Sequence, residues 1–405
     1  MNRVLLVCPE PLGHGQPAGV GIRFLEIARV LRDDGHAVTI LSPDAGALEG
    51  CKADFINPTT VTRHSADNDV AVLQGHVANG YYMDAKPTPT VVDLYDPFIV
   101  ENLHYYSQHG PGVFSHDHMT LMNSLVRGDF FLCASETQRF FYLGALLAAG
   151  RLNPVLFEAD PRAQSLIRLA PFGVQPPRDV ATRDLYRPEV LFGGIYDWYD
   201  PIMAIEAIAI ARDAVADITL TFTTHPNPEI TPQGKLAEAI AHVETRGYDF
   251  VKFEPWVAYE KRAQFFDRFT LALLTFPRSL ETDLSMRTRI YDYLWCGLPV
   301  VTSSAPGTDE ILHRYHAGRV IAQATPQAFA NEVVALLLAH ETYYSMVRGT
   351  QQFVHEHQWA KTLEPLREFC RAPKFDTTKE TFAAAPAIPD PPRSILHRIK
   401  RRLRS

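Results

Sequence analysis

Two arginines at the start of one expected helix are the residues best placed to bind an anion. Arg287 and Arg289 fall within residues 276–301, a stretch typical of a loop, a helix, a glycine stop and a buried strand. Ser285 is expected to cap the helix and Gly297 to end it. Cations in a first turn oppose the helix dipole, so they favour an anion held against the free amide groups. The pattern therefore predicts a phosphate or diphosphate site, with two surface arginines on a packing helix as the alternative.

Two more polar residues share this helix. Thr288, Arg289 and Asp292 are spaced to lie on one face, while Met286, Ile290 and Leu294 recur at the spacing of a core-facing face. Asp292 lies in the second turn, where its carboxylate is expected to accept hydrogen bonds from hydroxyl groups beside the phosphate.

The composition excludes several classes of protein. The chain has 405 residues and a formal net charge of −7, which argues against general nucleic-acid binding. Its five cysteines form no C-x-x-C pair, so the sequence predicts neither a disulfide framework nor a zinc site. His116 and His118 are adjacent metal-ligand types, but no third ligand lies near them in the sequence, so no metal is expected. We expect a cytoplasmic protein.

The elements alternate in two similar halves. Apolar strands followed by polar loops and amphipathic helices occur from residue 4 to residue 134, and the same alternation starts again at residue 190. This order predicts parallel β-α-β units in doubly wound sheets, an α/β fold. A Pro-rich stretch near residue 172 breaks the pattern. We predict a first domain over 1–171, a linker over 172–188, a second domain over 189–371, whose last helix has room to cross back to the first, and a flexible linker and tail over 372–405.

The tail carries a basic amphipathic pattern. Ile395, Ile399 and Leu403 fall at i, i+4 and i+8, and basic residues occupy most of the remaining positions between Arg393 and Arg404. Such a segment is expected to dock on an anionic membrane surface as a short helix, at the inner face of the membrane. A solvated tail without function is the alternative.

Three segments carry a resemblance to a known family. They are 193–201 (GGIYDWYDP), 256–262 (WVAYEKR) and 280–301, which includes the run DYLWCGLPV beginning at Asp292. With two α/β halves and a Gly-rich first loop, the chain resembles the GT-B glycosyltransferases, most closely family 4, the group 1 transferases. The resemblance implies two Rossmann-like domains facing a cleft, and it covers the chain up to about Cys370.

The resemblance also implies roles for residues of the second domain. A nucleotide-sugar should bind there, with its diphosphate near Arg287, Thr288 and Arg289 and its ribose on Asp292. Trp256 and Val257 follow a strand end where the family reads the base through backbone groups; a core tryptophan is the alternative for Trp256. Gly193 and Gly194 would let the backbone approach the phosphates closely, or simply form a tight turn.

The chain departs from the family pattern in two places. The family's paired acids are separated by seven residues, but Leu284 stands eight residues before Asp292. The first acid must then be Glu281 or Asp283, with Ser285 beside them as a further donor contact. The basic residue that many members carry after the first strand of the second domain is absent from 193–201. We expect Arg287 and Arg289 to supply that charge.

In the first domain the candidates lie at strand ends. Gly19 and Gly21 occur where the family's loop touches donor phosphate or acceptor, although a turn without a ligand fits equally well. Asp96 and the neighbouring Tyr95 follow one strand, and His76 follows another, so that each is a rival for contact with the acceptor hydroxyl.

The reaction expected is transfer of a sugar from a nucleotide-sugar to a saccharide or lipid-linked acceptor hydroxyl, with retention of configuration. The setting expected is surface polysaccharide or glycolipid assembly, without a cofactor.

Two alternatives stay open. One is an NAD-linked oxidoreductase, because Gly19-Val20-Gly21 precedes a helix and Asp44 follows the next strand, although the loop is not G-x-G-x-x-G. The other is an inactive nucleotide-sugar-binding or scaffold protein.

Overall fold

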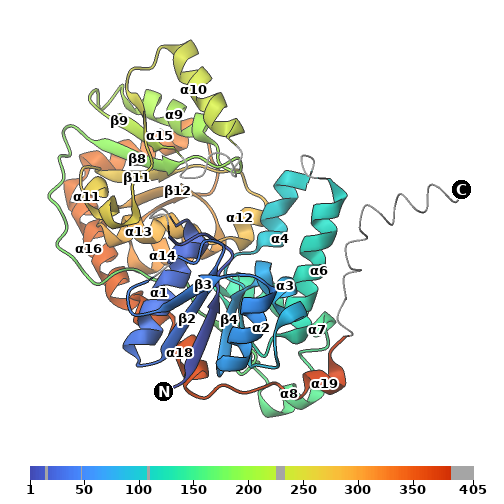
Figure 1. The fold of residues 1–405 in the computed structure, drawn as a ribbon. Helices are drawn as coiled ribbons and strands as arrows, with labels where there is room; N and C mark the ends of the chain where they lie inside the picture. The colour runs from blue at the N-terminus through green and yellow to red at the C-terminus, as the bar shows by residue number, and fades with distance from the viewer. Residues whose placement is uncertain (14–16, 47, 107–109, 225–232, 385–405) are drawn as a thin grey trace, which may run out of the picture.

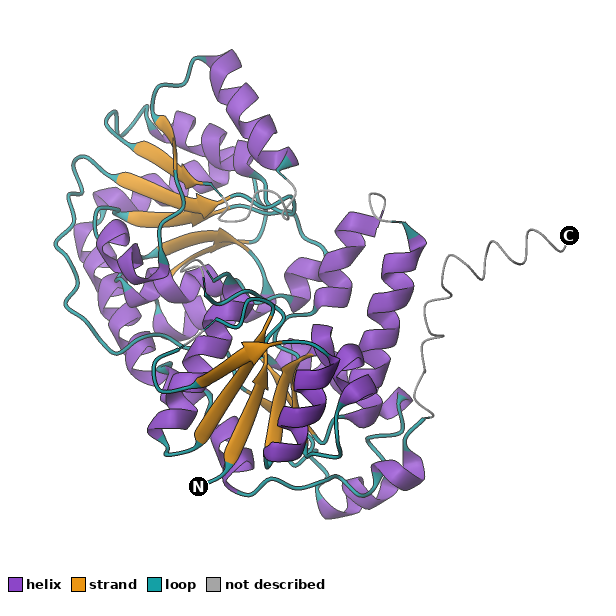
Figure 2. Cartoon of the chain, viewed as in Figure 1, coloured by secondary structure: helices purple, strands orange, loops and turns teal. Residues whose placement is uncertain are grey.

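The chain folds into two α/β lobes that face each other (Figure 1). The computed structural model describes residues 1–13, 17–46, 48–106, 110–224 and 233–384. Helices cover both faces of each sheet (Figure 2), as doubly wound sheets require. The predicted fold class, two Rossmann-like parallel sheets facing a cleft, is confirmed.

The first sheet has seven strands in the order β3-β2-β1-β4-β5-β6-β7, and every pair is parallel. Its central strands are fully buried, since residues Val4–Val7 and Val70–Leu73 have no exposed surface. The strands are β1 (Arg3–Val7), β2 (Ala37–Ser42), β3 (Lys52–Phe55), β4 (Val70–Gln74), β5 (Thr90–Asp93), β6 (Phe130–Cys133) and β7 (Ile167–Leu169). The helices are α1 (Gly19–Asp33), α2 (Pro58–Asp67), α3 (Ala78–Asp84), α4 (Phe98–Glu101), α6 (Pro111–Arg127), α7 (Glu136–Ala148) and α8 (Pro154–Ala159), with short 3-10 turns at Gly75–Val77 and Asn102–Tyr105.

The second sheet has six strands in the order β10-β9-β8-β11-β12-β13, again all parallel. Its strands are β8 (Glu189–Gly194), β9 (Thr219–Thr223), β10 (Val251–Glu254), β11 (Leu271–Leu274), β12 (Val300–Ser303) and β13 (Gly318–Ile321). Its helices are α9 (Pro201–Ala211), α10 (Gly234–Arg246), α11 (Arg262–Phe266), α12 (Leu280–Leu284), α13 (Thr288–Trp295), α14 (Pro306–Tyr315), α15 (Pro326–Leu338) and α16 (His340–Glu356), with a 3-10 turn at Tyr259–Lys261. The strand order reverses at β8 and β11, which places a binding crevice beyond their carboxyl ends.

The chain returns to the first lobe after α16. Helices α17 (Trp359–Thr362) and α18 (Glu364–Arg371) pack against α1 and β6, and α18 lies at the base of the first lobe in Figure 1. Arg367 of α18 forms a bidentate pair with Asp34, at the end of α1, at 2.6 and 2.7 Å. These contacts tie the end of the second half of the chain to the first domain.

The segment after α18 corrects the prediction of a flexible linker from residue 372. Asp376 accepts from the buried Arg151 at 2.6 Å, and the Lys379 ammonium of α19 (Lys379–Phe382) contacts Asp129 at 2.6 Å. Gly150 has φ +73°, and a Cβ there would lie 2.0 Å from the Phe382 carbonyl oxygen. Residues 372–384 therefore form a strap packed on the first domain. The basic tail from Arg393 to Arg404 lies outside the described residues.

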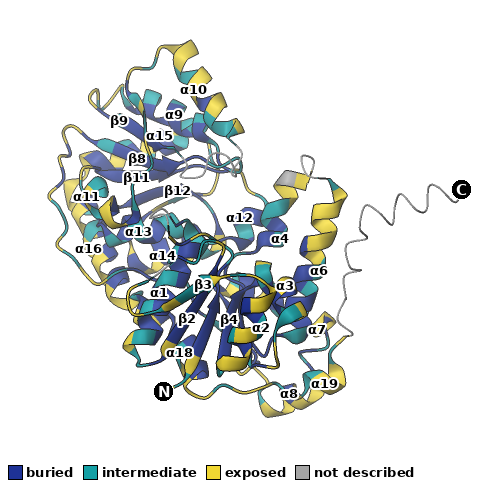
Figure 3. Ribbon diagram, viewed as in Figure 1, coloured by how far each residue is buried: buried dark blue, intermediate teal, exposed yellow. Residues whose placement is uncertain are grey.

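One further prediction changes in the second domain. The helix expected to start at Ser285 starts at Thr288, and a separate turn, α12, precedes it. Burial follows the sheets and the inner helix faces (Figure 3). No helix among the described residues is long and apolar enough to cross a membrane.

Candidate active site

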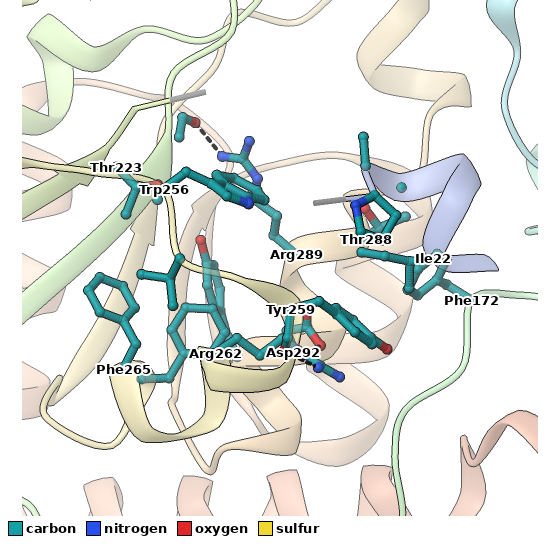
Figure 4. A pocket seen from close by; sticks show the side chains of 18 of the residues that line it. Ile22, Phe172, Thr223, Trp256, Tyr259, Arg262, Phe265, Thr288, Arg289 and Asp292 are labelled. Atoms are coloured by element: carbon teal, nitrogen blue, oxygen red, sulfur yellow. Dashed lines mark hydrogen bonds and ion pairs between the residues drawn. The ribbon is translucent and has the colours of Figure 1, made fainter. Parts of the chain in front are cut away.

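A pocket lies between the domains, beyond the carboxyl ends of β8, β9 and β10 (Figure 4). It runs from Thr223 and Phe265 at one end to Ile22 and Phe172 at the other. The second domain supplies most of the wall. The lining residues are Pro17, Ala18, Gly19, Ile22, Phe172, Gly193, Gly194, Tyr196, Thr223, Trp256, Val257, Tyr259, Arg262, Phe265, Phe266, Thr288, Arg289, Asp292 and Tyr293.

Arg289 is the cation of this pocket at the start of α13. Its guanidinium lies over the Tyr196 ring at 4.7 Å, and Nη1 donates to the Gly194 carbonyl. Nη2 is buried and has no hydrogen-bond partner among the described residues. No side chain caps α13, and the amides of Thr288 and Ile290 donate to the Met286 and Arg287 carbonyls, each at 2.9 Å. The first turn therefore offers a ligand the Arg289 amide and the Thr288 hydroxyl. This arrangement fits an anion such as a phosphate.

The two glycines at the end of β8 make room for this arginine. Gly193 has φ +85°, a left-handed conformation that side chains other than glycine rarely adopt. A Cβ at Gly193 would lie 2.4 Å from the Tyr293 hydroxyl, and one at Gly194 would lie 3.0 Å from Arg289 Nη2. The backbone of this turn thus approaches the guanidinium closely because it has no side chains.

Arg287 does not face the pocket, which corrects the expectation that both arginines hold a diphosphate. Its guanidinium forms a bidentate pair with Glu281 at 2.6 and 2.7 Å, and the two side chains are 4% and 1% exposed. Because both Glu281 oxygens accept from Arg287, Glu281 is not available to bind a donor sugar, which corrects its expected role as the first acid. Burial of both partners makes this pair part of the core between α12 and α13.

Ser285 and Asp283 also lie outside the pocket. Ser285 ends α12 and does not cap α13; its hydroxyl donates to Glu101 of α4 in the first domain at 3.0 Å. Asp283 faces Arg278 at 3.4 Å on the outer side of α12. Because α12 is a helical turn of its own, it moves these residues away from the face of α13 that carries Arg289. Neither residue is placed to contact a ligand in the pocket.

Asp292 lines the pocket one turn after Arg289 and is already paired. Oδ1 accepts from Arg262 Nε at 2.9 Å, the contact drawn in Figure 4. Burial raises the pKa of Asp292, and the Arg262 charge opposes that rise. The carboxylate is held by one oxygen, so that the other can accept from a ligand hydroxyl.

Trp256 and Val257 lie at the end of the pocket furthest from the first domain. The Trp256 amide donates to the Thr224 hydroxyl at 3.2 Å, and both residues join Phe265 and Phe266 in an apolar wall. Trp256 is half-buried and not part of the core. An apolar slot of this kind suits an aromatic ring, with polar groups nearer to Arg289.

The start of α1 contributes backbone rather than charge. Gly19 lines the pocket, and a Cβ there would lie 3.3 Å from the Tyr95 hydroxyl and 3.9 Å from Thr288 Oγ1 of the other domain. Gly21 is turned away, because its amide donates to the Glu10 carboxylate at 2.8 Å. Glu10 therefore occupies the position at this helix start that an external anion would need.

Asp96 and His76 lie near the cleft but do not line the pocket. Asp96 stands beside Glu101, and burial together with the Glu101 carboxyl raises the pKa of Asp96 well above its usual range. His76 packs edge-on against Phe98 at 5.1 Å, and burial lowers the pKa of its imidazole. The structure brings neither residue together with Arg289 and Asp292.

Tyr196, Tyr259 and Arg262 are among the pocket residues that sequence reasoning missed. Tyr196 falls in the quoted segment 193–201, and the other two fall in 256–262. Their signal was their place next to glycines and strand ends, but their roles depend on partners distant in sequence. No group of three or more metal-ligand side chains occurs in the part of the chain that the structure describes.

Comparison with solved structures shows the class of fold. The crystal structure of HepE from Anabaena in complex with UDP and glucose is 15% identical, with a TM-score of 0.69 over 92% of this chain and 100% of that chain. Sucrose-phosphate synthase from Thermosynechococcus elongatus is 13% identical, with a TM-score of 0.67 over 92% and 98% of the two chains. WaaG, a glycosyltransferase involved in lipopolysaccharide biosynthesis, is 13% identical, with a TM-score of 0.62 over 90% and 98%. The fold is GT-B, as in these proteins.

The second domain also matches a family model. Residues 187–339 match the model of the glycosyl transferases group 1, and they contain every strand of the second sheet. No curated protein sequence is measurably similar to the chain. The match confirms, over the second domain, the resemblance to the group 1 transferases that the sequence predicted, and the solved structures confirm the GT-B fold for both domains.

Proposed function

We propose that this glycosyltransferase takes a sugar from a nucleotide-sugar bound in the interdomain pocket and transfers it to an acceptor hydroxyl with retention of configuration. The observation that carries the proposal is Arg289, a pocket cation beside an uncapped helix start, with a buried Nη2 that has no partner among the described residues. HepE has been crystallised with UDP-glucose, which supports a nucleotide-sugar donor.

In the proposed complex each part of the donor meets a matching surface. The diphosphate lies against the guanidinium and the amide of Arg289 and the Thr288 hydroxyl. The ribose hydroxyls donate to Asp292, and the base lies in the apolar slot at Trp256 and Val257. The glycine turn at 193–194 lets the phosphates approach the backbone closely.

The chemical step breaks the bond between the sugar C1 and the phosphate oxygen and forms one between C1 and the acceptor oxygen. The diphosphate leaves with the electron pair, and fixed positive charge at Arg289 stabilises it as it departs. Asp292 is the carboxylate that lines the described pocket. Its Oδ1 is paired with Arg262, so we do not assign Asp292 as a nucleophile. We therefore assign the acceptor's proton to an oxygen of the leaving phosphate, with the sugar attacked from the same face.

A calorimetric binding screen tests the proposal. UDP, GDP, ADP and CDP, their common sugar conjugates and NAD are titrated into the full chain. Binding of one nucleotide diphosphate, weakened by Asp292→Asn, supports the proposal, whereas binding of NAD alone would contradict it. We expect EDTA to leave binding unchanged, because the proposed diphosphate site uses an arginine, its own backbone amide and a hydroxyl rather than a metal.

Turnover of the donor separates an enzyme from a binding protein. Slow hydrolysis of the bound nucleotide-sugar without acceptor, abolished by Arg289→Ala, is expected of a transferase. The dinucleotide alternative is weakened by Asp44, whose carboxylate accepts from the amides of Leu12 and Gly13 at 2.9 and 2.7 Å and so is occupied within its own domain.

We assign the acceptor to surface polysaccharide or glycolipid assembly, at the cytoplasmic side of a membrane, as WaaG acts in lipopolysaccharide biosynthesis. Support from this chain is the tail, which has six arginines and lysines between Arg393 and Arg404. Each can contribute ~1 kcal/mol near an anionic surface.

Co-sedimentation with anionic liposomes is expected for the full chain and not for a chain stopped at Pro392, and it should weaken with salt. Equal sedimentation of both would contradict it.

A further inference from the structure

A buried carboxylate of the first domain is hydrogen-bonded to the wall of the pocket. Glu26 of α1 is 3% exposed, and its Oε1 accepts from the Tyr259 hydroxyl at 3.2 Å and from Gln175 Nε2 at 2.8 Å. Tyr259 belongs to the second domain, and Gln175 belongs to the segment that joins the two. Three parts of the chain thus meet at one oxygen atom.

Tyr259 in turn supports Arg262. The guanidinium carbon of Arg262 lies 3.4 Å from the centre of the Tyr259 ring, and Nη1 donates to the Tyr259 carbonyl at 2.6 Å. Arg262 Nε then donates to Asp292 Oδ1 at 2.9 Å. A continuous series of contacts therefore runs from Glu26 to Asp292, and Figure 4 shows its last three members side by side.

We propose that Glu26 and Tyr259 are positioning residues of the donor site, which orient Asp292 through Arg262 only when the two domains are closed. The inference rests on the proposed function, because it takes Asp292 as the donor ligand. Glu26 Oε1 also pairs with Arg29 of its own helix, a contact that does not depend on the second domain. Opening the domains would therefore remove the Tyr259 hydrogen bond, which contributes to the stability of the closed arrangement. Donor binding and domain closure should therefore favour each other, since such coupling is reciprocal.

The geometry favours this series over a merely structural contact. Tyr259 and Arg262 both line the pocket, so a ligand bound there would contact them directly. The Glu26 carboxylate is buried, and burial raises its pKa, while the Arg29 charge and the hydrogen bonds from Tyr259 and Gln175 oppose that rise. A contact with these properties is sensitive to small changes in domain position.

Tyr259→Phe is the sharpest test, because it removes one hydroxyl and keeps the ring beneath Arg262. We expect the donor Kd and KM to rise about 3–10-fold, the effect of one lost hydrogen bond, with kcat at saturating donor and the acceptor KM changed less than about 2-fold. Tyr315→Phe is the matched control, since its hydroxyl donates to Glu356 at 2.6 Å outside the pocket, and it should leave the Kd unchanged.

A double variant tests the link to the other domain. Glu26→Leu should raise the donor Kd by a similar factor, and Glu26→Leu combined with Tyr259→Phe should raise it no further than the larger single change. Multiplying effects, or a Tyr259→Phe enzyme with the wild-type Kd, would overturn the inference. The titrant is the nucleotide diphosphate that binds wild type in the screen. If the wild-type protein binds no nucleotide diphosphate, the proposed function itself fails. If the wild-type protein binds one and Tyr259→Phe does not weaken that binding, only the positioning role fails.

Discussion

The starts of α1 and α13 both face the pocket, one from each domain, and they differ in what already occupies them. At α1 the Glu10 carboxylate accepts from the Gly21 amide at 2.8 Å. At α13 no side chain caps the first turn. A helix start that holds its own carboxylate has no place for another anion, whereas an uncapped one does. The diphosphate is therefore proposed to lie at α13.

Each of these helix starts also has one arginine buried against a carboxylate. Arg23 of α1 pairs with Asp93 at 2.5 Å, with both side chains fully buried, and Arg287 before α13 pairs with Glu281. The difference between the two regions is Arg289, a second arginine at α13 without a carboxylate partner among the described residues. An arginine's position in sequence does not show its role, because its nearest acid decides whether it is structural or free to bind ligand.

The largest effect is expected from breaking a buried pair. Arg287→Ala should lose about 3–5 kcal/mol of stability because Glu281 is left buried and unpaired. The unfolding midpoint should then fall by about 6–20 °C in calorimetry. Arg278→Ala is the control, because its partner Asp283 is 3.4 Å away and Arg278 is 78% exposed, and it should change the midpoint little. Equal midpoints for both variants would place Arg287 outside the core.

Arg289→Ala should act on turnover instead. Loss of one preorganised charge at the leaving group costs about 10²–10³ in kcat. Arg289→Lys should retain part of the rate, since it keeps the charge and loses the planar fork. Steady-state kinetics and calorimetry of the same samples separate the two arginines. Wild-type turnover in Arg289→Ala would remove the diphosphate assignment from α13.

Asp96→Asn tests the acids that the first domain brings to the cleft. Burial and the Glu101 carboxyl raise the pKa of Asp96, so the folded protein keeps a proton that the unfolded chain releases at about pH 4. The stability of wild type should therefore fall as pH rises from about 4 toward the raised pKa. An asparagine at this position does not ionise, so the variant should not lose this stability. Relative to wild type, the unfolding midpoint of the variant should therefore rise as pH increases from about 4 to 8, as measured by calorimetry at each pH.

Asp283→Asn is the control for this pH series, because its carboxylate lies beside Arg278 at the surface of α12. Comparing the two variants at each pH separates the effect of the Asp96 site from that of replacing any carboxylate by an amide. An Asp96→Asn midpoint that keeps a constant difference from wild type across the series would contradict a raised pKa at Asp96.

The smallest effect is expected at the start of α1. Glu10→Gln keeps an acceptor for the Gly21 amide and removes only the charge, which is worth about 0.3–1 kcal/mol at a helix start. The change in kcat should therefore stay within about 5-fold, measured beside Arg289→Ala. A 10²-fold loss would give Glu10 a direct part in the reaction and would end the distinction between the two helix starts.

Much of the fold could be predicted because its elements are encoded locally. The buried strands at Val4–Val7 and Leu271–Leu274 are continuous apolar runs followed by glycine or polar loops. Short or polar strands escaped notice, as β3 with its Lys52-Ala-Asp-Phe55 sequence and β13 show. Such strands form because a neighbouring strand offers them a ladder of hydrogen bonds, and their own sequences contain little periodicity.

The sequence by itself determined the two α/β halves, the face of α13 shared by Thr288, Arg289 and Asp292, and the glycines opposite it. These depend on periodicity and on backbone freedom, which act within a few residues. Only the tertiary structure decided that Arg287 pairs with Glu281, that residues 372–384 pack on the first domain, and that Glu26 reaches Tyr259. Partners of buried charges are chosen by distance in space, because an unpaired charge is costly wherever its partner lies in the chain.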